Sequence, residues 1–249
     1  MKYKSWLAIG IALTVLLSAC ARAQNAAQAK WNETQARETA LAIARGWKFS
    51  PDDFTGDPPA NLQHNVYAVL HFDNAETSRW LLLIATEPPD NTCHACAPVT
   101  GAVIFALKDG AWHAVYDQPH VIDSGSFGKP PSPSARNLGP SKPAVEFDLG
   151  SMAQGYEFNS STFVTEINHK LREVLSIPTG ESNEATGAQQ EQTFRWQAKV
   201  ETSQSVHEGF ADIVVSFSGT KVVDDGSTIR PYSETWTYRF NGEVYKKVE

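Results

Sequence analysis

Residues 194–200, Phe-Arg-Trp-Gln-Ala-Lys-Val, decide the fold, because apolar and polar side chains alternate along the whole stretch. A period of two places the apolar side chains on one face of a β-strand. The same pattern returns at residues 213–217 and 236–240, and an Asn-Gly pair typical of tight hairpin turns follows at 241–242. We therefore predict that residues 193–249 form an antiparallel β-meander.

Upstream of this meander the sequence also favours strands. Short runs rich in β-branched and aromatic residues are separated by polar turns, one of which carries the Asp-Gly pair typical of hairpins. The expected strands are residues 66–72, 80–85, 99–107, 112–116 and 145–149. A stretch rich in Pro, Ser and Gly at 124–143 is predicted to be a long loop.

Residues 163–177 fit two structures. Apolar side chains recur there with a helical period, yet residues 163–167 are β-rich and Asn168-His169 could turn a hairpin. We favour the hairpin because most of the surrounding sequence has β character. The next segment, 179–192, is acidic and has no apolar period, so we predict a linker or a long exposed turn.

Residues 31–47 depart from the β pattern and predict an amphipathic helix. Asn32 can cap its N-terminus with Gln35 reaching back, and Gly46 gives a stop signal. The expected fold class is therefore mainly β (α+β): antiparallel sheets or hairpins with one N-terminal amphipathic helix. Residues 31–178 should form the helix and a β-rich domain, against which the C-terminal meander packs.

The first twenty residues resemble a bacterial lipoprotein signal peptide. A basic start precedes an apolar run at 6–17, which is shorter than the roughly 20 residues that a membrane-spanning helix needs. The run ends in Leu17-Ser18-Ala19-Cys20, which matches a lipobox. The resemblance implies that the signal peptide, residues 1–19, is removed and that Cys20 is acylated, with palmitate among the attached chains.

The same resemblance implies a location. Residues 20–30 would be the lipidated cysteine and a small, polar tether. Ala21 stands where an aspartate would favour the inner membrane in enteric bacteria, so we expect the outer membrane, facing the periplasm. The N-terminal lipid would be the only contact with the membrane.

The charge balance limits the partners. Without residues 1–19 the chain loses two lysines and no acidic residue, which leaves 19 basic and 28 acidic side chains and a formal charge of −9. Such a surface repels phosphate backbones, so no nucleic-acid partner is expected. The expected partner is a protein or small molecule that the sequence does not identify.

Cys93-His94-Ala95-Cys96 is the candidate for chemistry. With Cys20 acylated, these are the remaining thiols, and an oxidising periplasm favours a disulfide between them. A ring this small would shape a local bend. The second alternative is a redox dithiol in which His94 lowers the pKa of a thiol, although the strand–helix context of thioredoxin-like enzymes is missing.

A metal site is the third alternative for this motif. Thiolates from Cys93 and Cys96 suit zinc or copper, with a histidine completing the ligand set. That histidine would be His94 itself, or His71, His113 or His120 if the sheet brings one of them close. Apart from such a metal, no cofactor is expected.

The sequence contains neither a G-x-S-x-G nor an H-E-x-x-H pattern. The leading hypothesis is therefore a non-enzymatic binding or envelope-associated module that faces the periplasm. The alternative is a thiol-redox or metal-handling protein that uses the motif at 93–96. That motif, with the Gly-containing stretch at 124–128, is similar to uncharacterised secreted bacterial proteins.

Overall fold

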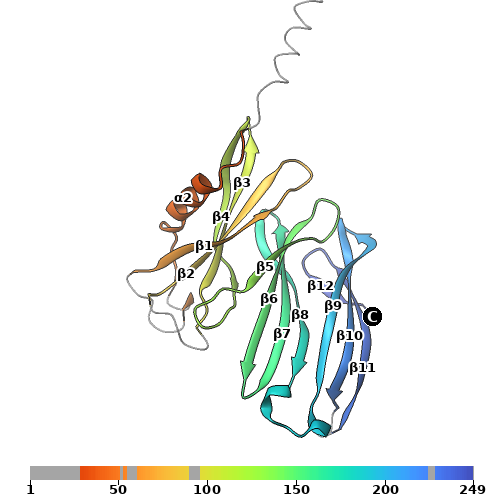
Figure 1. The fold of residues 1–249 in the computed structure, drawn as a ribbon. Helices are drawn as coiled ribbons and strands as arrows, with labels where there is room; N and C mark the ends of the chain where they lie inside the picture. The colour runs from red at the N-terminus through yellow and green to blue at the C-terminus, as the bar shows by residue number, and fades with distance from the viewer. Residues whose placement is uncertain (1–28, 51–52, 55–60, 90–95, 224–227, 249) are drawn as a thin grey trace, which may run out of the picture.

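The computed structural model describes residues 29–50, 53–54, 61–89, 96–223 and 228–248. The lipobox, Cys93 and His94 lie outside these residues. Within them the chain is mainly β, with two antiparallel sheets and one α-helix, as the sequence predicts (Figure 1).

The helix begins where the sequence places it. Helix α2 (Glu33–Ala44) is capped by Asn32, whose Oδ1 accepts the N–H of Gln35 at 3.2 Å. Just before it, the chain is fixed to the far end of the first sheet. The N–H of Ala29 donates to the carbonyl of Gly110 at 2.8 Å, and the indole of Trp112 donates to the carbonyl of Ala29.

The first sheet is a four-stranded meander. Its order is β1 (Gln63–His71), β2 (Arg79–Glu87), β3 (Val99–Lys108) and β4 (Ala111–Asp123). The Asp-Gly pair does turn a hairpin, between β3 and β4. Asp109 and Gly110 have φ angles of 50° and 79°, which the short Asn/Asp/Gly side chains tolerate.

The second sheet has eight strands, each paired with its neighbours in the sequence. Two single 3-10 turns, Glu184–Thr186 and Gln190–Gln192, connect its fourth and fifth strands. The strands are β5 (Ser132–Asn137), β6 (Pro143–Ala153), β7 (Tyr156–Ile167), β8 (Lys170–Ser182), β9 (Arg195–His207), β10 (Phe210–Val222), β11 (Ile229–Phe240) and β12 (Tyr245–Lys247).

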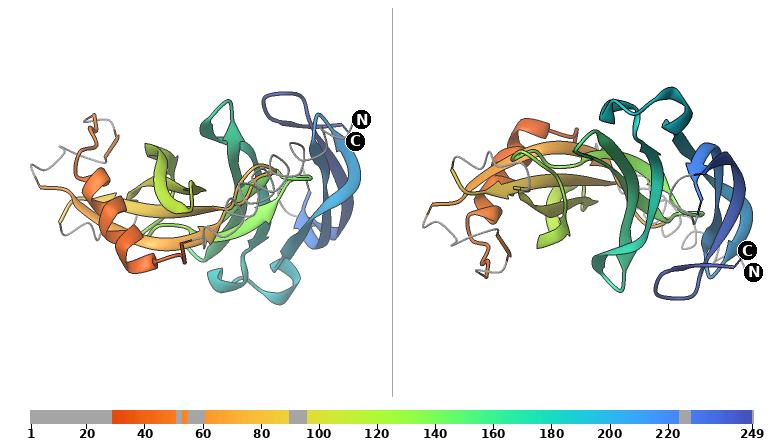
Figure 2. Two further views of the ribbon diagram at one scale, coloured as in Figure 1. Left: turned by 90° about the horizontal axis from the view of Figure 1, so that it is seen from above. Right: turned by 90° about the horizontal axis from the view of Figure 1, so that it is seen from below.

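The chain is built in layers, which the views along the strands separate (Figure 2). Three apolar clusters lie between them. The first joins α2 to one face of the four-stranded sheet, and the second joins the other face to strands β6–β8. The third lies between strands β6–β8 and strands β9–β12, so the eight-stranded sheet folds back on itself. Residues 143–147 of β6 and 161–165 of β7 are therefore buried on both faces.

Burial on both faces explains the sequence of these central strands. On β6, Ala144 contributes to the third cluster and Val145 to the second, and on β7 the same is true of Phe163 and Val164. A strand covered on both sides carries nearly continuous apolar residues rather than strict alternation. Alternation survives in the first part of β9, where Trp196 is buried, Ala198 and Val200 are half-buried and the residues between them are exposed.

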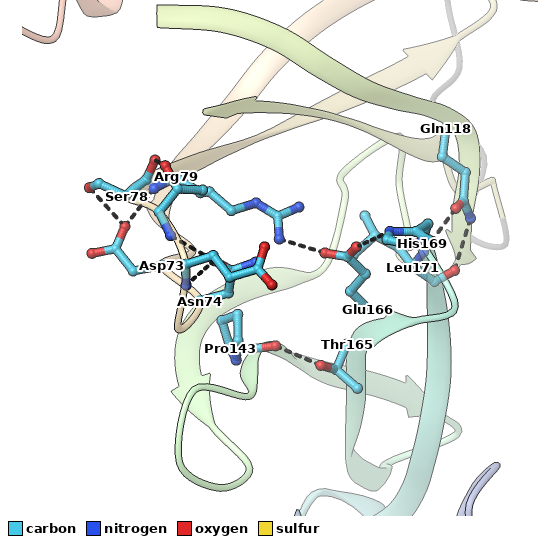
Figure 3. Close-up of polar contacts among 12 residues, drawn as sticks. Asp73, Asn74, Ser78, Arg79, Gln118, Pro143, Thr165, Glu166, His169 and Leu171 are labelled. Atoms are coloured by element: carbon cyan, nitrogen blue, oxygen red, sulfur yellow. Dashed lines mark hydrogen bonds and ion pairs between the residues drawn. The ribbon is translucent and has the colours of Figure 1, made fainter. Parts of the chain in front are cut away.

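Polar contacts fix the first sheet against β7 and β8 (Figure 3). Arg79 on β2 forms an ion pair with Glu166 on β7, with Nη1 and Oε2 2.6 Å apart. Gln118 on β4 bonds the backbone of Leu171 on β8 twice, since its amide accepts from the N–H and donates to the carbonyl, both at 3.1 Å. The side chain of Gln118 thus satisfies backbone groups at the start of β8 that a neighbouring strand would otherwise pair with.

Three details of the predicted elements are decided by the structure. The hairpin at 163–177 is confirmed, because β7 and β8 meet at Asn168 and His169, with φ angles of 51° and 59°. The predicted loop at 124–143 contains strand β5, which the sequence analysis missed. The first residues of the expected linker at 179–192 belong to β8, which extends to Ser182.

Candidate binding groove

A cleft of about 940 Å³ opens between strands β5, β6 and β9. The hairpin that joins β5 to β6 forms one wall, and Val200, Glu201 and Thr202 of β9 form the other. Phe163 and Ile213 lie in its apolar floor, and the turn between β1 and β2 closes one end. The cleft therefore draws on both sheets.

A second hollow of about 470 Å³ continues the cleft toward the junction of β8 and β9. The two share Arg136, Glu146 and Val200 in their linings. We call the two together the β5–β9 groove. It spans β9 from Arg195 to Thr202.

The groove runs along the edges of β5 and β9 and crosses one face of β6 and β7. Successive side chains of a strand point to opposite faces, so a hollow on one face touches every second residue. Here three consecutive residues of β5 (135–137) and eight consecutive residues of β9 (195–202) line it. Both strands thus border the groove with their edges.

Those edges have no strand partner within the described part of the chain. Strand β5 pairs only with β6. Strand β9 pairs along its length with β10, but with β8 only at Gly180–Gln197, Glu181–Trp196 and Ser182–Arg195. Beyond Gln197 the two strands separate, and the seam between β8 and β9 is open.

The hairpin wall of the groove is held in place by the far end of the sheet. The carbonyl of Leu138 accepts the N–H of Ala211 at 2.6 Å, and Leu138 itself is fully buried. Gly139 has a φ of +156°, and a Cβ there would meet the carbonyl oxygen of Gly209 at 2.2 Å. Only glycine permits this close approach, which connects the hairpin to the turn between β9 and β10.

Acidic side chains dominate the groove. Its cationic side chains already have anionic neighbours: Arg136 pairs with Glu146, Arg195 with Glu184 and Lys199 with Glu201. Three further carboxylates of the lining have no cationic partner among the described residues, namely Asp148, Glu157 and Glu181. The groove therefore carries an excess of negative charge.

Two of these carboxylates are oriented by neutral donors. The hydroxyl of Ser161 donates to Asp148 at 3.1 Å, and the indole of Trp196 donates to Glu181 at 3.2 Å. Neutral donors hold a carboxylate in place without cancelling its charge. Both groups remain able to attract a cation in the groove.

No family model, curated protein or solved structure matches this chain.

The thiol motif is only partly within the described residues. Cys93 and His94 lie outside them, whereas Cys96 begins a described segment and its carbonyl accepts the N–H of Gly128 at 2.9 Å. This contact places the end of the motif beside the loop at 124–130. The disulfide, redox and metal alternatives stay predictions.

The three candidate histidines lie at separate places on the first sheet. His71 contacts Trp80 with the two rings tilted by 53° and their centroids 3.8 Å apart, and it borders the groove. His120, near the end of β4, lies 2.8 Å from Asp123, while His113 lies beside Ala106 near the start of β4. Among the described residues, no group of three or more His, Cys, Asp or Glu side chains is arranged to hold a metal ion.

No local pattern in the sequence indicates the groove. Its members come from every strand between β5 and β10 and from the turn between β1 and β2, which no local motif connects. The alternation in residues 194–200 did identify β9, but not that its edge is open. The nearest signal was the proline in β5, Pro133, because strands at the edge of a sheet tolerate proline.

Proposed function

We propose that this chain is a periplasm-facing bacterial lipoprotein, anchored through Cys20, that acts as a non-enzymatic binding module. The β5–β9 groove is its binding element. The observation that carries the proposal is a large groove bordered by two unpaired strand edges, one of them held in a fixed position through Leu138 and Gly139. A preformed concave site of this size is typical of ligand-binding proteins.

The polar groups of the groove support binding rather than chemistry. Glu146 is buried and engaged by Arg136, and Asp148 and Glu181 each accept a hydrogen bond from a neutral side chain. These contacts fix side-chain positions and charge. They are the elements of recognition, in which a few placed polar groups set orientation over an apolar floor.

The anchoring part of the proposal rests on the lipobox resemblance. No helix in the described residues is long and apolar enough to cross a bilayer. Membrane fractionation tests the anchor. The unaltered chain should sediment with outer membranes and incorporate labelled palmitate, whereas Cys20→Ser should do neither. Equal membrane recovery of both forms would overturn the lipid anchor.

Site-directed photocrosslinking tests the groove. A photoreactive phenylalanine analogue replaces Glu201, which is exposed in the groove wall, in cells that express the full chain. The matched control places it at Glu191, an exposed glutamate in the turn between β8 and β9 that does not line the groove. We expect a discrete adduct from position 201 alone. Adducts from position 191 with none from 201 would overturn the groove as the binding element.

A further inference from the structure

The open side of β9 carries backbone groups that a strand could pair with. The N–H of Arg195 donates to the side-chain hydroxyl of Thr220 on β10 at 3.2 Å, whereas the carbonyl of Phe194 accepts the N–H of Asn183, the residue after β8, also at 3.2 Å. Because backbone groups of a strand alternate between its two edges, even-numbered residues of β9 face the β8 side. Val200 is the first of these to lie clearly beyond the end of the ladder with β8.

An unpaired strand edge is a template for another strand. Many proteins use such edges to bind extended peptides, in which main-chain hydrogen bonds provide affinity and side-chain contacts provide specificity. In this chain the open edge of β9 lines a groove, and the buried side chains of Phe163 and Ile213 lie beneath it. A strand added there would continue the ladder that β8 leaves at Gln197.

The charge of the groove selects the occupant. Asp148, Glu157 and Glu181 lie where the groove meets the junction of β8 and β9, without a cationic partner among the described residues. An extended segment presents alternate side chains to one face, so lysines or arginines at every second position would meet these carboxylates. Complementary charge of this kind favours encounter and fixes register.

We propose that the β5–β9 groove binds an extended, basic polypeptide segment of another protein, which pairs with the open edge of β9 as an additional strand. This inference rests on the proposed function, since it names the occupant of the same groove. The experiment below tests whether the occupant pairs as a strand and whether it is basic. The crosslinking experiment above tests separately whether the groove binds anything.

The experiment measures binding of a short fluorescent peptide that alternates lysine and valine to the detergent-solubilised lipoprotein. Two matched peptides serve as controls. One carries N-methyl groups on alternate amides, which removes the donors for strand pairing and keeps every side chain. The other replaces each lysine by glutamate. We expect the unmodified basic peptide to bind, with an affinity that falls as salt is added, and both controls to bind at least tenfold more weakly.

Two protein variants locate the contact. Val200→Pro removes an N–H on the open side of β9 and leaves the ladder with β10 intact, so affinity should fall by about fivefold, the effect of one hydrogen bond. Asp148→Asn with Glu181→Gln should weaken binding by roughly tenfold and reduce its salt dependence. Glu191→Gln, outside the groove, should leave binding unchanged.

The outcomes are distinct. Equal binding of the N-methylated and unmodified peptides would overturn strand addition. Equal binding of the basic and acidic peptides, or binding of neither, would overturn the basic occupant. A crosslink from position 201 would still support the groove as a binding site in each of these cases. Should Val200→Pro unfold, the N-methylated peptide decides the same question on the unaltered protein.

Discussion

Arg79 on β2 and Glu166 on β7 form an ion pair of 2.6 Å across the interface between the two sheets. Arg79 is buried at 6% exposure, and its Nε has no hydrogen-bond partner among the described residues. Removing the carboxylate would leave a buried, uncompensated guanidinium.

We therefore expect Glu166→Gln to lower the free energy of unfolding by about 3 kcal/mol, because breaking a buried ion pair costs more than losing an exposed one. Urea unfolding at neutral pH measures the change. The exposed pair of Arg37 and Glu33 provides the control, and Glu33→Gln should change stability by no more than about 0.5 kcal/mol. Similar losses in both variants would contradict a special role for the inter-sheet pair.

A glycine comparison tests whether the hairpin wall of the groove is tightly packed. Gly139→Ala should destabilise the chain by about 3 kcal/mol, since its Cβ would collide with the carbonyl oxygen of Gly209. Gly110→Ala should cost only about 1 kcal/mol, because φ is also positive there but nothing lies within 4 Å of the added atom. Thermal unfolding of the two variants gives the ranking, and equal losses would rule out the collision.

Stability should also depend on pH through Asp73, at the end of the groove. Burial alone would raise the pKa of Asp73, but the backbone N–H of Arg79, the hydroxyl of Ser78 and His71 together hold this pKa below its usual value. Since the folded-state pKa is depressed, this stabilisation is present above about pH 4, the unfolded value, and is lost as pH falls through the folded value.

The Asp73→Asn variant should accordingly be less stable than the parent at pH 7 and should lose less stability between pH 4 and acid. Chemical unfolding across this range measures both slopes. Asp109→Asn, in the exposed turn between β3 and β4, is the control and should follow the parent. Parallel curves for the parent and Asp73→Asn would contradict the prediction.

The thiol motif has a direct test on the full chain. If Cys93 and Cys96 form the expected disulfide, titration should find no free thiol before reduction and two afterwards. A reduction potential below about −300 mV would mark it as structural. Bound metal is counted on the same sample. Zinc or copper at one equivalent, lost in Cys93→Ser, would favour the metal alternative instead.

The sequence predicted elements well where a local rule applied. Asn168 accepts a positive φ more readily than most residues, so the β7–β8 turn could be identified in spite of the helical spacing around it. The capping side chain of Asn32 predicted the start of α2. Each of these predictions depended on residues close together in the chain.

The groove depended on pairings that no local pattern contains. Residues 132–137, Ser-Pro-Ser-Ala-Arg-Asn, lack apolar alternation because β5 lies at the edge of its sheet and contributes little to the core. Strands β8 and β9 pair at only three positions, and this short pairing does not change the alternation of apolar residues in β9. The sequence therefore does not show that the edge of β9 is open. Register and edge status arise from tertiary packing.

The contact between Ala29 and Gly110 fixes the start of the folded domain at the β3–β4 turn. Nine residues beyond Cys20 extend at most about 30 Å, so a lipid on Cys20 would keep the β3–β4 turn within that distance of the bilayer. The hairpin between β6 and β7 lies at the opposite end of the molecule (Figure 1). The domain would then be tethered by a short segment. The length of that tether would limit the groove to partners that come close to the same membrane.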